Sequence, residues 1–248
     1  MSKFTAGIIV IGDEILSGRT QDINSNFIAK HLVKAGIKLE EIRIIQDDRE
    51  AIIQNIIHFH KTYTYVFTTG GIGPTHDDIT SESVSLAFNE KYCFHPKAFK
   101  ILEEYYSKGE FNEGRQKMAK MPENAQLILN PLSVAPGFII RNVYVLPGIP
   151  EIMQKMFVNV LQHIKKGPPK TTITINTNLY ESNMAIGLAA IQNKNLNFSI
   201  GSYPYYNYID KIGGVNIVIS SWDSNNLGSI VVEIKKMILL LGGKSTIV

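Results

Sequence analysis

The sequence is poor in cysteine and in net charge, and it contains no long apolar run. Cys93 is the single cysteine among 248 residues, which excludes an internal disulfide and a cysteine zinc site and fits a reducing compartment. Lys and Arg total 25 against 22 Asp and Glu, so we expect no broad electrostatic binding of nucleic acid. No segment approaches the roughly 20 apolar residues of a membrane span, and the amino terminus lacks a secretory signal pattern. We therefore expect a cytoplasmic protein without a membrane partner.

Apolar patterning predicts an α/β domain in the first two thirds of the chain. With 44% hydrophobic residues the chain can bury a sizeable core. Apolar, partly β-branched runs indicate strands at Phe4–Ile11, Tyr65–Thr69 and Val143–Leu146, and Ile37–Ile45 is predicted as a further strand. Helical periodicity falls between them, at residues 22–35, about 52–57, 80–89, 96–108 and 150–164. This alternation predicts a three-layer, doubly wound, mostly parallel sheet.

A basic, proline-containing segment at residues 165–170 predicts a boundary between two domains, one of residues 1–166 and one of residues 171–248. In the second part, strands are expected at residues 171–176, 197–203 and 215–220. Helices are expected at residues 182–193 and 224–241, the latter capped by Asp223. The β-α-β-β-α order predicts a small α+β domain of ferredoxin-like type.

The strongest local motif is GGIGPTHDD, residues 70–78, between a predicted strand and a predicted helix. Gly70, Gly71 and Gly73 allow a tight turn and bring backbone N–H groups close to a ligand. The helix that follows adds the positive end of its dipole. Together these features predict a phosphate cradle.

The acids of this motif have two interpretations. In one, Asp77, Asp78 and Thr80 cap the following helix, which explains the acids but not the three glycines. In the other, the acids lie near the phosphate, where each carboxylate about 4 Å away is repelled by about 4 kcal/mol at an effective dielectric constant of 20. A bridging divalent cation, Mg²⁺ above all, removes that repulsion. For His76 we expect a solvated loop position rather than a catalytic one.

Four loops are expected to meet at one edge of the sheet, because the loops that follow parallel strands gather where ligands bind. They comprise residues 12–18, residues 47–48, the GGIGPTHDD motif and residues 146–151. Taken singly, Asp13 and Glu14 fit a solvated turn near a helix start. Taken together, acids from three of these loops favour a site.

Several motifs resemble a known family. GDEILSG, DINSN, IIQDD, TTGGIGPTHDD, VAPGF and LPGIPEIM occur in this order. The same order is found in the MoaB/Mog molybdopterin-binding fold and most closely in the amino-terminal domain of CinA (competence/damage-inducible) proteins. The likeness covers residues 4–165 strongly. Residues 141–151 also resemble the corresponding domain of eukaryotic FAD synthases.

The resemblance implies functional acids at Asp48 and Asp78, and basic residues at Lys117 and Arg115 that could face phosphate or lie on a solvated helix face. We expect Asp48, Asp78 and Lys117 to be catalytic and Asp48, Asp77 and Asp78 to hold the metal. The expected ligand-binding residues are Gly12, Asp13, Glu14, Gly70, Gly71, Gly73, Pro74, Thr75, Arg115, Gly137, Pro147 and Gly148.

Three functions follow from the resemblance and the cradle. The first is a pyrophosphatase, dependent on Mg²⁺ or else Mn²⁺ or Co²⁺, that acts on a phosphorylated small molecule of ADP-ribose or FAD type. The second is a protein that binds or adenylylates molybdopterin, and the third is a ligand-binding module without turnover. The sequence departs from the family pattern in two places. The chain leaves no room for the amidase domain of full-length CinA, so we expect no amidase activity. Ser133 and Val134 stand where the family often has Gly-Thr.

A concentration of aromatic residues in the second domain predicts self-association. Exposed sheet faces and edges need covering, and aromatic residues are enriched where surfaces associate. The residues concerned are Phe198, Ile200, Tyr203, Tyr205, Tyr206 and Tyr208. They could instead pack on the first domain. With the family resemblance, we expect a homodimer.

Overall fold

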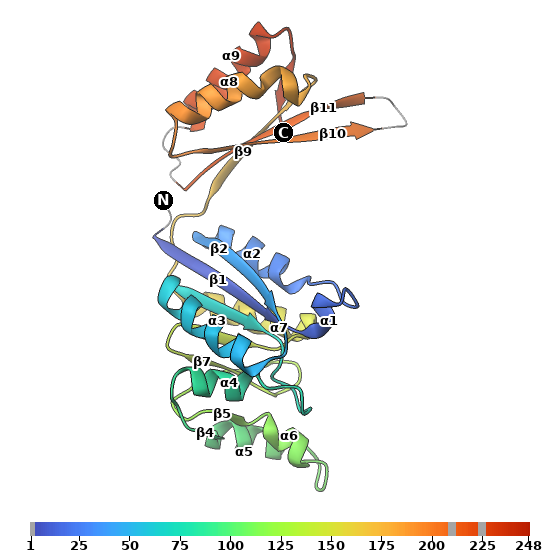
Figure 1. Ribbon diagram of the computed structural model, residues 1–248, viewed down its shortest axis with the longest axis vertical. Coiled ribbons are helices and arrows are strands. Elements are labelled where there is room, and N and C mark those ends of the chain that lie inside the picture. Colours follow the sequence, from blue (N-terminus) through green and yellow to red (C-terminus); the bar gives the residue numbers. More distant parts are fainter. Residues whose placement is uncertain (1–2, 208–211, 223–226) are drawn as a thin grey trace. The chain divides into compact units, whose positions relative to one another are not determined.

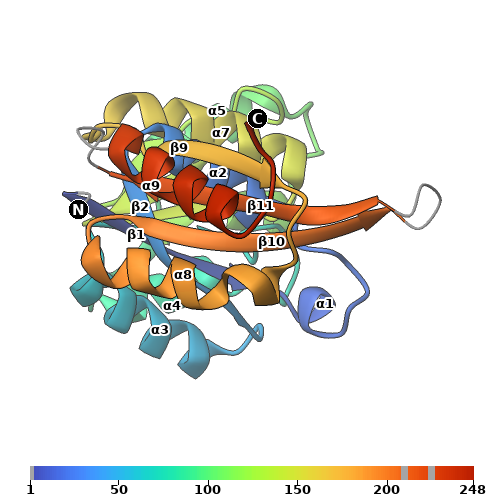
Figure 2. The ribbon, with the colours of Figure 1, turned by 90° about the horizontal axis from the view of Figure 1, so that it is seen from above.

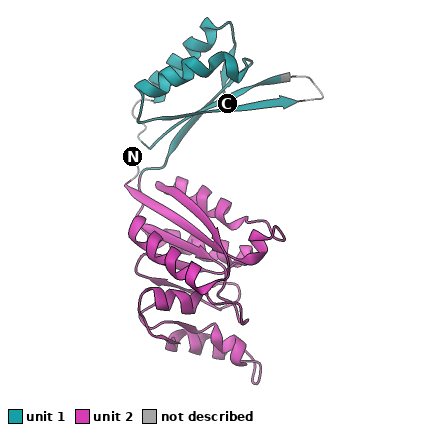
Figure 3. Cartoon of the chain, viewed as in Figure 1, with its two compact units in different colours: residues 1–2, 168–248 teal, residues 3–167 magenta. Residues whose placement is uncertain are grey.

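The computed structural model describes residues 3–207, 212–222 and 227–248. The chain separates into two compact units, a large one of Lys3–Gly167 and a small one that contains Pro168–Val248 (Figure 3). Among the described residues, no helix is long and apolar enough to cross a membrane.

A six-stranded sheet forms the centre of the large unit, in the order β2-β1-β3-β8-β7-β6 (Figure 1). Its strands are β1 (Phe4–Ile11), β2 (Ile37–Ile45), β3 (Tyr65–Thr69), β6 (Gln126–Ile128), β7 (Gly137–Ile140) and β8 (Val143–Leu146). The first four strands in this order pair in parallel, whereas β7 and β6 are antiparallel. Strands β1, β3 and β8 are mostly buried and apolar, as expected for strands covered on both faces, whereas the edge strand β2 alternates buried and exposed residues and carries four charged side chains.

Helices cover both faces of this sheet and complete the three predicted layers. On one face lie α2 (Asn24–Lys34) and α7 (Pro150–His163), and Ile8, Ile28, Phe67 and Phe157 are fully buried there. On the other face lie α3 (Arg49–Thr62) and α4 (Thr80–Ala87), around the second apolar cluster. The α/β fold class is therefore confirmed.

Shorter elements complete the large unit. Helix α1 (Asp13–Leu16) follows β1, and α5 (Pro96–Tyr105) and α6 (Glu113–Lys117) flank a two-stranded sheet of β4 (Tyr92–Phe94) and β5 (Lys120–Pro122). Three-residue strands such as β4 and β5 carry too few residues to show a period, so the sequence did not indicate them.

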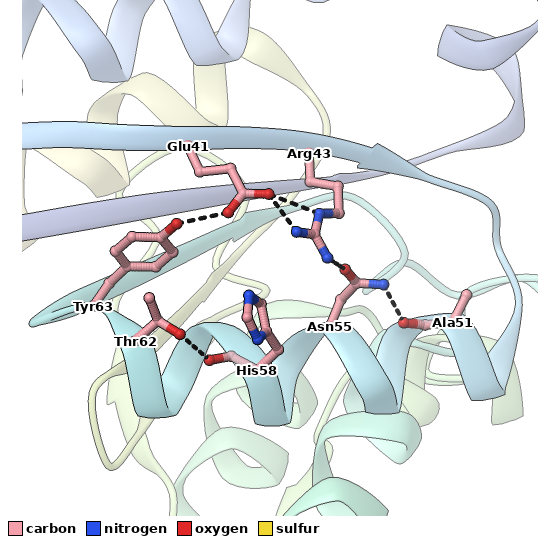
Figure 4. Close-up of polar contacts among 7 residues, drawn as sticks. All are labelled: Glu41, Arg43, Ala51, Asn55, His58, Thr62 and Tyr63. Atoms are coloured by element: carbon pink, nitrogen blue, oxygen red, sulfur yellow. Dashed lines mark hydrogen bonds and ion pairs between the residues drawn. The ribbon is translucent and has the colours of Figure 1, made fainter.

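A polar cluster attaches the edge strand β2 to α3 (Figure 4). The Glu41 carboxylate accepts a hydrogen bond of 2.9 Å from Arg43 Nε and one of 2.6 Å from the Tyr63 hydroxyl. Arg43 also donates to Asn55 Oδ1 at 2.6 Å, and its guanidinium carbon lies 5.0 Å from the centre of the Phe59 ring. These polar contacts, in addition to apolar packing, hold the edge strand β2 against α3.

The small unit has a four-stranded antiparallel sheet in the order β10-β11-β9-β12. Its elements are β9 (Thr171–Thr177), α8 (Glu181–Lys194), β10 (Ser199–Asn207), β11 (Ile212–Ser221), α9 (Leu227–Leu240) and β12 (Ser245–Ile247). Both helices pack on one face of the sheet (Figures 1 and 2). The short strand β12, which the sequence did not indicate, completes a βαββαβ order. The expected cap Asp223 and the expected surface residue Tyr208 lie outside the described residues.

Candidate functional site

A cavity of about 520 Å³ opens at the carboxyl ends of β1, β2, β3 and β8. All four loops that the sequence placed there contribute to it, each following a buried parallel strand. The lining residues are Ile11, Gly12, Glu14, Asp47, Gly70, Gly71, Ile72, Gly73, Pro74, Asp77, Asp78, Met118, Asn130, Ser133, Ala135, Pro136, Pro147, Gly148, Ile149 and Ile152. The topology thus brings acids from three separate loops to one cavity.

Gly70 and Gly71 are required by packing inside the protein. Their φ angles are +104° and +67°, values that side chains with a Cβ rarely adopt. A Cβ on Gly70 would lie 2.1 Å from the carbonyl oxygen of Ile11, and one on Gly71 would lie 2.1 Å from Thr80 Oγ1. The Thr80 hydroxyl in turn donates to the carbonyl of Gly70 at 3.1 Å. Gly70 therefore lets the end of β3 lie against the end of β1, and Gly71 lets the start of α4 lie against this loop.

The next part of the motif is a turn held by its own side chains. The backbone N–H of Thr75 donates to Asp78 Oδ2 at 2.8 Å, and the Thr75 hydroxyl donates to both Asp77 and Asp78. Hydrogen bonding by Thr75 lowers the pKa of Asp77. A Cβ on Gly73 would lie 2.7 Å from Asp78 Oδ2, so Gly73 leaves room for the Asp78 carboxylate at the cavity wall.

Two neighbouring acids, Asp47 and Asp48, have different environments. Asp47 lines the cavity, and its Oδ2 accepts the backbone N–H of Asp13 at 3.0 Å. Asp48 caps α3, where its Oδ1 accepts the N–H of Ala51 at 2.9 Å, and it does not line the cavity. From the sequence we expected Asp48 at the site, whereas in the structure Asp47 lines the cavity and Asp48 does not.

Partial burial raises the pKa of Asp47, and the negative charges of Asp13, Glu14 and Asp77 raise it further. The hydrogen bond from Asp13 opposes this shift. Negative charge therefore accumulates around Asp47.

The predicted basic residues lie beside the cavity. The Lys117 ammonium donates to the carbonyl oxygen of Thr75 and so supports the turn. The Arg115 guanidinium donates to the Glu110 carbonyl at 2.6 Å and stacks 4.2 Å from the centre of the Tyr106 ring. Neither side chain lines the cavity.

The other predicted residues are distributed as follows. Gly12, Glu14, Pro74, Pro147 and Gly148 line the cavity, in addition to the glycines and acids of the motif. Asp13, Thr75 and Gly137 are adjacent to lining residues without lining it themselves. The side chain of His76 is 98% exposed and lies 3.9 Å from Asp77, as expected for a loop histidine.

Residues 130–136 form a wall of the cavity, of which the sequence indicated the ligand-facing loop at Ser133 and Val134 but not Asn130. Asn130 is buried, donates to Ser133 Oγ at 2.7 Å and to the Ala135 carbonyl at 3.0 Å, and accepts two backbone N–H groups. Val134 has a φ of +58°, which is strained for a β-branched residue. The departure from Gly-Thr at residues 133 and 134 was the available signal for this wall.

The charge of the cavity is one-sided. Glu14, Asp47, Asp77 and Asp78 line it, and none of the described lining residues is Lys or Arg. Across the described part of the chain, no group of three or more His, Cys, Asp or Glu side chains is arranged to hold a metal ion by itself. Any cation here would need oxygen atoms from a ligand or from water as well.

Comparison with known proteins identifies two segments. Residues 7–166 match the family model described as "Probable molybdopterin binding domain", and residues 169–240 match "FAD synthase, middle domain". A solved structure of the protein CinA, of unknown function, from Thermoplasma acidophilum is 28% identical. It covers 65% of this chain and 98% of its own, with a TM-score of 0.61.

Full-length relatives differ in length from this chain. A protein from Archaeoglobus fulgidus is 35% identical over 82% of this chain and 86% of its own. A "Putative competence-damage inducible protein" of Clostridium botulinum is 32% identical over 80% of this chain and 51% of its own. A "Probable FAD synthase" of Caenorhabditis elegans is 30% identical over 94% of this chain and 50% of its own. The chain therefore spans about half the length of the last two.

Proposed function

Because this chain belongs to the "Probable molybdopterin binding domain" family, in the form found in CinA-like proteins, we propose that it is a metal-dependent pyrophosphatase. Its substrate is a nucleotide diphosphate compound of ADP-ribose or FAD type. The observation that carries the proposal is a cavity with four carboxylates, beside a glycine-rich loop, and without Lys or Arg among its described lining residues. A diphosphate can enter such a cavity only with cations that offset the repulsion between like charges.

The residues present fit a hard divalent cation. Burial raises the pKa of Asp47, and the negative charges of Asp13, Glu14 and Asp77 raise it further; a cation would relieve that repulsion. Mg²⁺ takes one or two protein carboxylates and completes its shell with water and phosphate oxygens. Asp47 and Asp78, supported by Asp77, would hold it, and Mn²⁺ or Co²⁺ could replace it. When bound, the cation would offset negative charge on the phosphates and on the leaving group.

The protein's own residues would bind and orient the substrate. A water oxygen bonds to one phosphorus, the bridging P–O bond breaks, and the two protons of the water end on the two phosphate products. Thr75 fixes the carboxylates of Asp77 and Asp78. Lys117 fixes Thr75 through its carbonyl. Lys117 therefore acts as a positioning residue in this proposal, and Asp48 acts as a helix cap.

The second candidate is binding or adenylylation of molybdopterin, favoured by the description of the family to which residues 7–166 belong. The same cavity would receive the phosphate of the pterin. Both candidates need the cation, so the acids alone do not separate them.

The deciding experiment measures AMP release from ADP-ribose and from FAD, with Mg²⁺, Mn²⁺ or Co²⁺ and with a chelator as control. The proposal expects metal-dependent formation of AMP together with ribose 5-phosphate or FMN. Binding of these nucleotides without product would indicate a ligand-binding module. An absence of binding to both, with binding of molybdopterin, would favour the second candidate.

A further inference from the structure

A second, smaller cavity of about 70 Å³ adjoins the main one, and Ile11, Glu14 and Gly148 line both. It lies at the start of α2, where Asn24 and Thr69 also line it. Residues 22–24, the first three of the DINSN motif, supply this wall. The proposed chemistry at the main cavity gives this motif no role.

Among the described residues, Asn24 Oδ1 and Ser25 Oγ of this motif are buried without a hydrogen-bond partner, and of these two residues only Asn24 lines the cavity. Asn24 is 7% exposed, and its Nδ2 donates to the carbonyl oxygen of Gly148 at 2.8 Å. This bond fixes the orientation of the amide, because the reversed orientation would place two oxygen atoms against each other. The Asn24 Oδ1 atom is then buried without a hydrogen-bond partner in the described part of the chain. A buried acceptor of this kind is rare in folded proteins, since leaving it unsatisfied costs free energy.

The surroundings restrict what can satisfy Asn24 Oδ1. Glu14 and Asp22 line the same small cavity, and they disfavour a phosphate or any other anion. The volume admits a hydroxyl or amino group and not a whole ring system. Asp22 is itself engaged, because its Oδ1 accepts the N–H of Ser25 at 3.1 Å. The group that suits this place is therefore an N–H or O–H donor rather than an anion, and a nucleotide carries uncharged donors of both kinds.

We propose that Asn24 is a specificity-determining residue, whose Oδ1 accepts a hydrogen bond from a neutral donor of the ligand when its phosphates occupy the main cavity. This inference rests on the proposed function, since it assumes a nucleotide-type ligand. The donor is either a sugar hydroxyl or an N–H of the heterocycle, which share this chemistry.

Gly148 connects the two parts of the site. A Cβ on Gly148 would lie 3.4 Å from the Cα of Gly70, so Gly148 sits directly against the glycine-rich loop. Asn24, by holding the Gly148 carbonyl, fixes the distance between the acceptor and the phosphate region. The site would therefore favour ligands whose hydrogen-bond donor lies at a fixed distance from their phosphates.

The test is calorimetric binding of ADP-ribose, in the presence of Mg²⁺, to the wild type and to Asn24→Ala. The expected result is about tenfold weaker binding by the variant, the effect of one uncharged hydrogen bond. Asn26→Ala is the matched control, because Asn26 lies in the same helical turn but is exposed. Its affinity should equal that of the wild type.

Analogues identify the donor and separate recognition from support of the fold. The 2′-deoxy and 3′-deoxy forms of the adenosine ribose test the hydroxyls, and the N6,N6-dimethyladenine form tests the heterocycle. The analogue that lacks the donor should bind wild type about tenfold more weakly than ADP-ribose does, and Asn24→Ala should bind the two alike. If Asn24→Ala fails to fold, the same comparison is made with Asn24→Ser.

Two outcomes would overturn the inference. If every analogue binds wild type as tightly as ADP-ribose does, or if Asn24→Ala loses affinity for all of them equally, Asn24 does not read a donor and the proposed function stands. If wild type binds neither ADP-ribose nor FAD, the proposed function and this inference fail together.

Discussion

The backbone N–H of Asp13 donates a 3.0 Å hydrogen bond to the carboxylate of Asp47, which joins the loop after β1 to the loop after β2. The bond turns the Asp47 side chain into the cavity, whereas that of Asp48 turns to the first turn of α3. Two adjacent acids therefore have separate roles, and substitutions can distinguish them.

Asp47→Asn should reduce metal-dependent AMP release by at least about a hundredfold, as expected when a metal-holding charge is lost. Its fold should persist, because an asparagine Oδ1 can still accept the Asp13 N–H. Asp48→Asn is the matched control, since asparagine caps helices as well as aspartate does, and its turnover should stay near that of wild type. The reverse order of the two activities would show that Asp48 holds the metal.

Gly71→Ala should destabilise the protein by more than the strain of its φ angle alone. The added Cβ would meet Thr80 Oγ1 at 2.1 Å, in addition to adopting a φ of +67°. Gly109→Ala is the control, because Gly109 has a φ of +89° with nothing within 4 Å. We expect a loss of about 1 kcal/mol for Gly109→Ala and a clearly larger loss for Gly71→Ala, measured by urea unfolding. Equal losses would contradict the close packing at Thr80.

The Glu41 cluster should contribute stability that depends on pH. The hydrogen bond from Tyr63, followed by Arg43, lowers the pKa of Glu41 from 4.5. Stability from Glu41 is thus present above pH 4.5 and is lost as the pH falls through the lowered value. Burial, then Glu41, raises the pKa of Tyr63 from 10.0 to about 12. That part of the stability is complete below pH 10 and is lost as the pH rises through about 12.

Tyr63→Phe should lower the free energy of unfolding by about 1 kcal/mol at pH 7 and should weaken its dependence on pH below 4.5. Urea unfolding across this range measures both. Tyr65→Phe is the control, since the Tyr65 hydroxyl donates to the backbone carbonyl of Lys165, an acceptor that does not titrate. If the free energy of unfolding falls equally below pH 4.5 in Tyr63→Phe and in wild type, the hydrogen bond from Tyr63 does not set the pKa of Glu41.

We expect a homodimer formed through the small unit. Tyr203 is 59% exposed on β10, on the sheet face opposite α8 and α9, and large exposed aromatics are enriched at interfaces. Light scattering at micromolar concentration should give twice the chain mass of 27.7 kDa. Tyr203→Glu should give the monomer mass, whereas Tyr180→Glu, at a 68% exposed tyrosine just before α8, should not. A monomer in wild type would refute the prediction.

The sequence determined the parallel part of the large sheet. The predicted strands coincide with β1, β2, β3 and β8, and the mostly buried β1, β3 and β8 are apolar because both of their faces are covered. The α/β fold class and the meeting of four loops at one sheet edge followed from the alternation of strands and helices, whereas the family resemblance rested on the motifs. The short strands β4 to β7 and β12 did not, since strands of three or four residues are too short to show a period.

Only the tertiary structure decided which polar residues face the cavity. Asp47 and Asp48 are equivalent in the sequence, and the hydrogen bond with Asp13 and the cap on α3 separate them. Gly71 looked like a ligand contact and is also required by Thr80. The unpaired oxygen of Asn24 arises because a carbonyl 124 residues away binds the other end of its amide. Periodicity reports which segments are buried, whereas side-chain direction depends on contacts between segments that are distant in the chain.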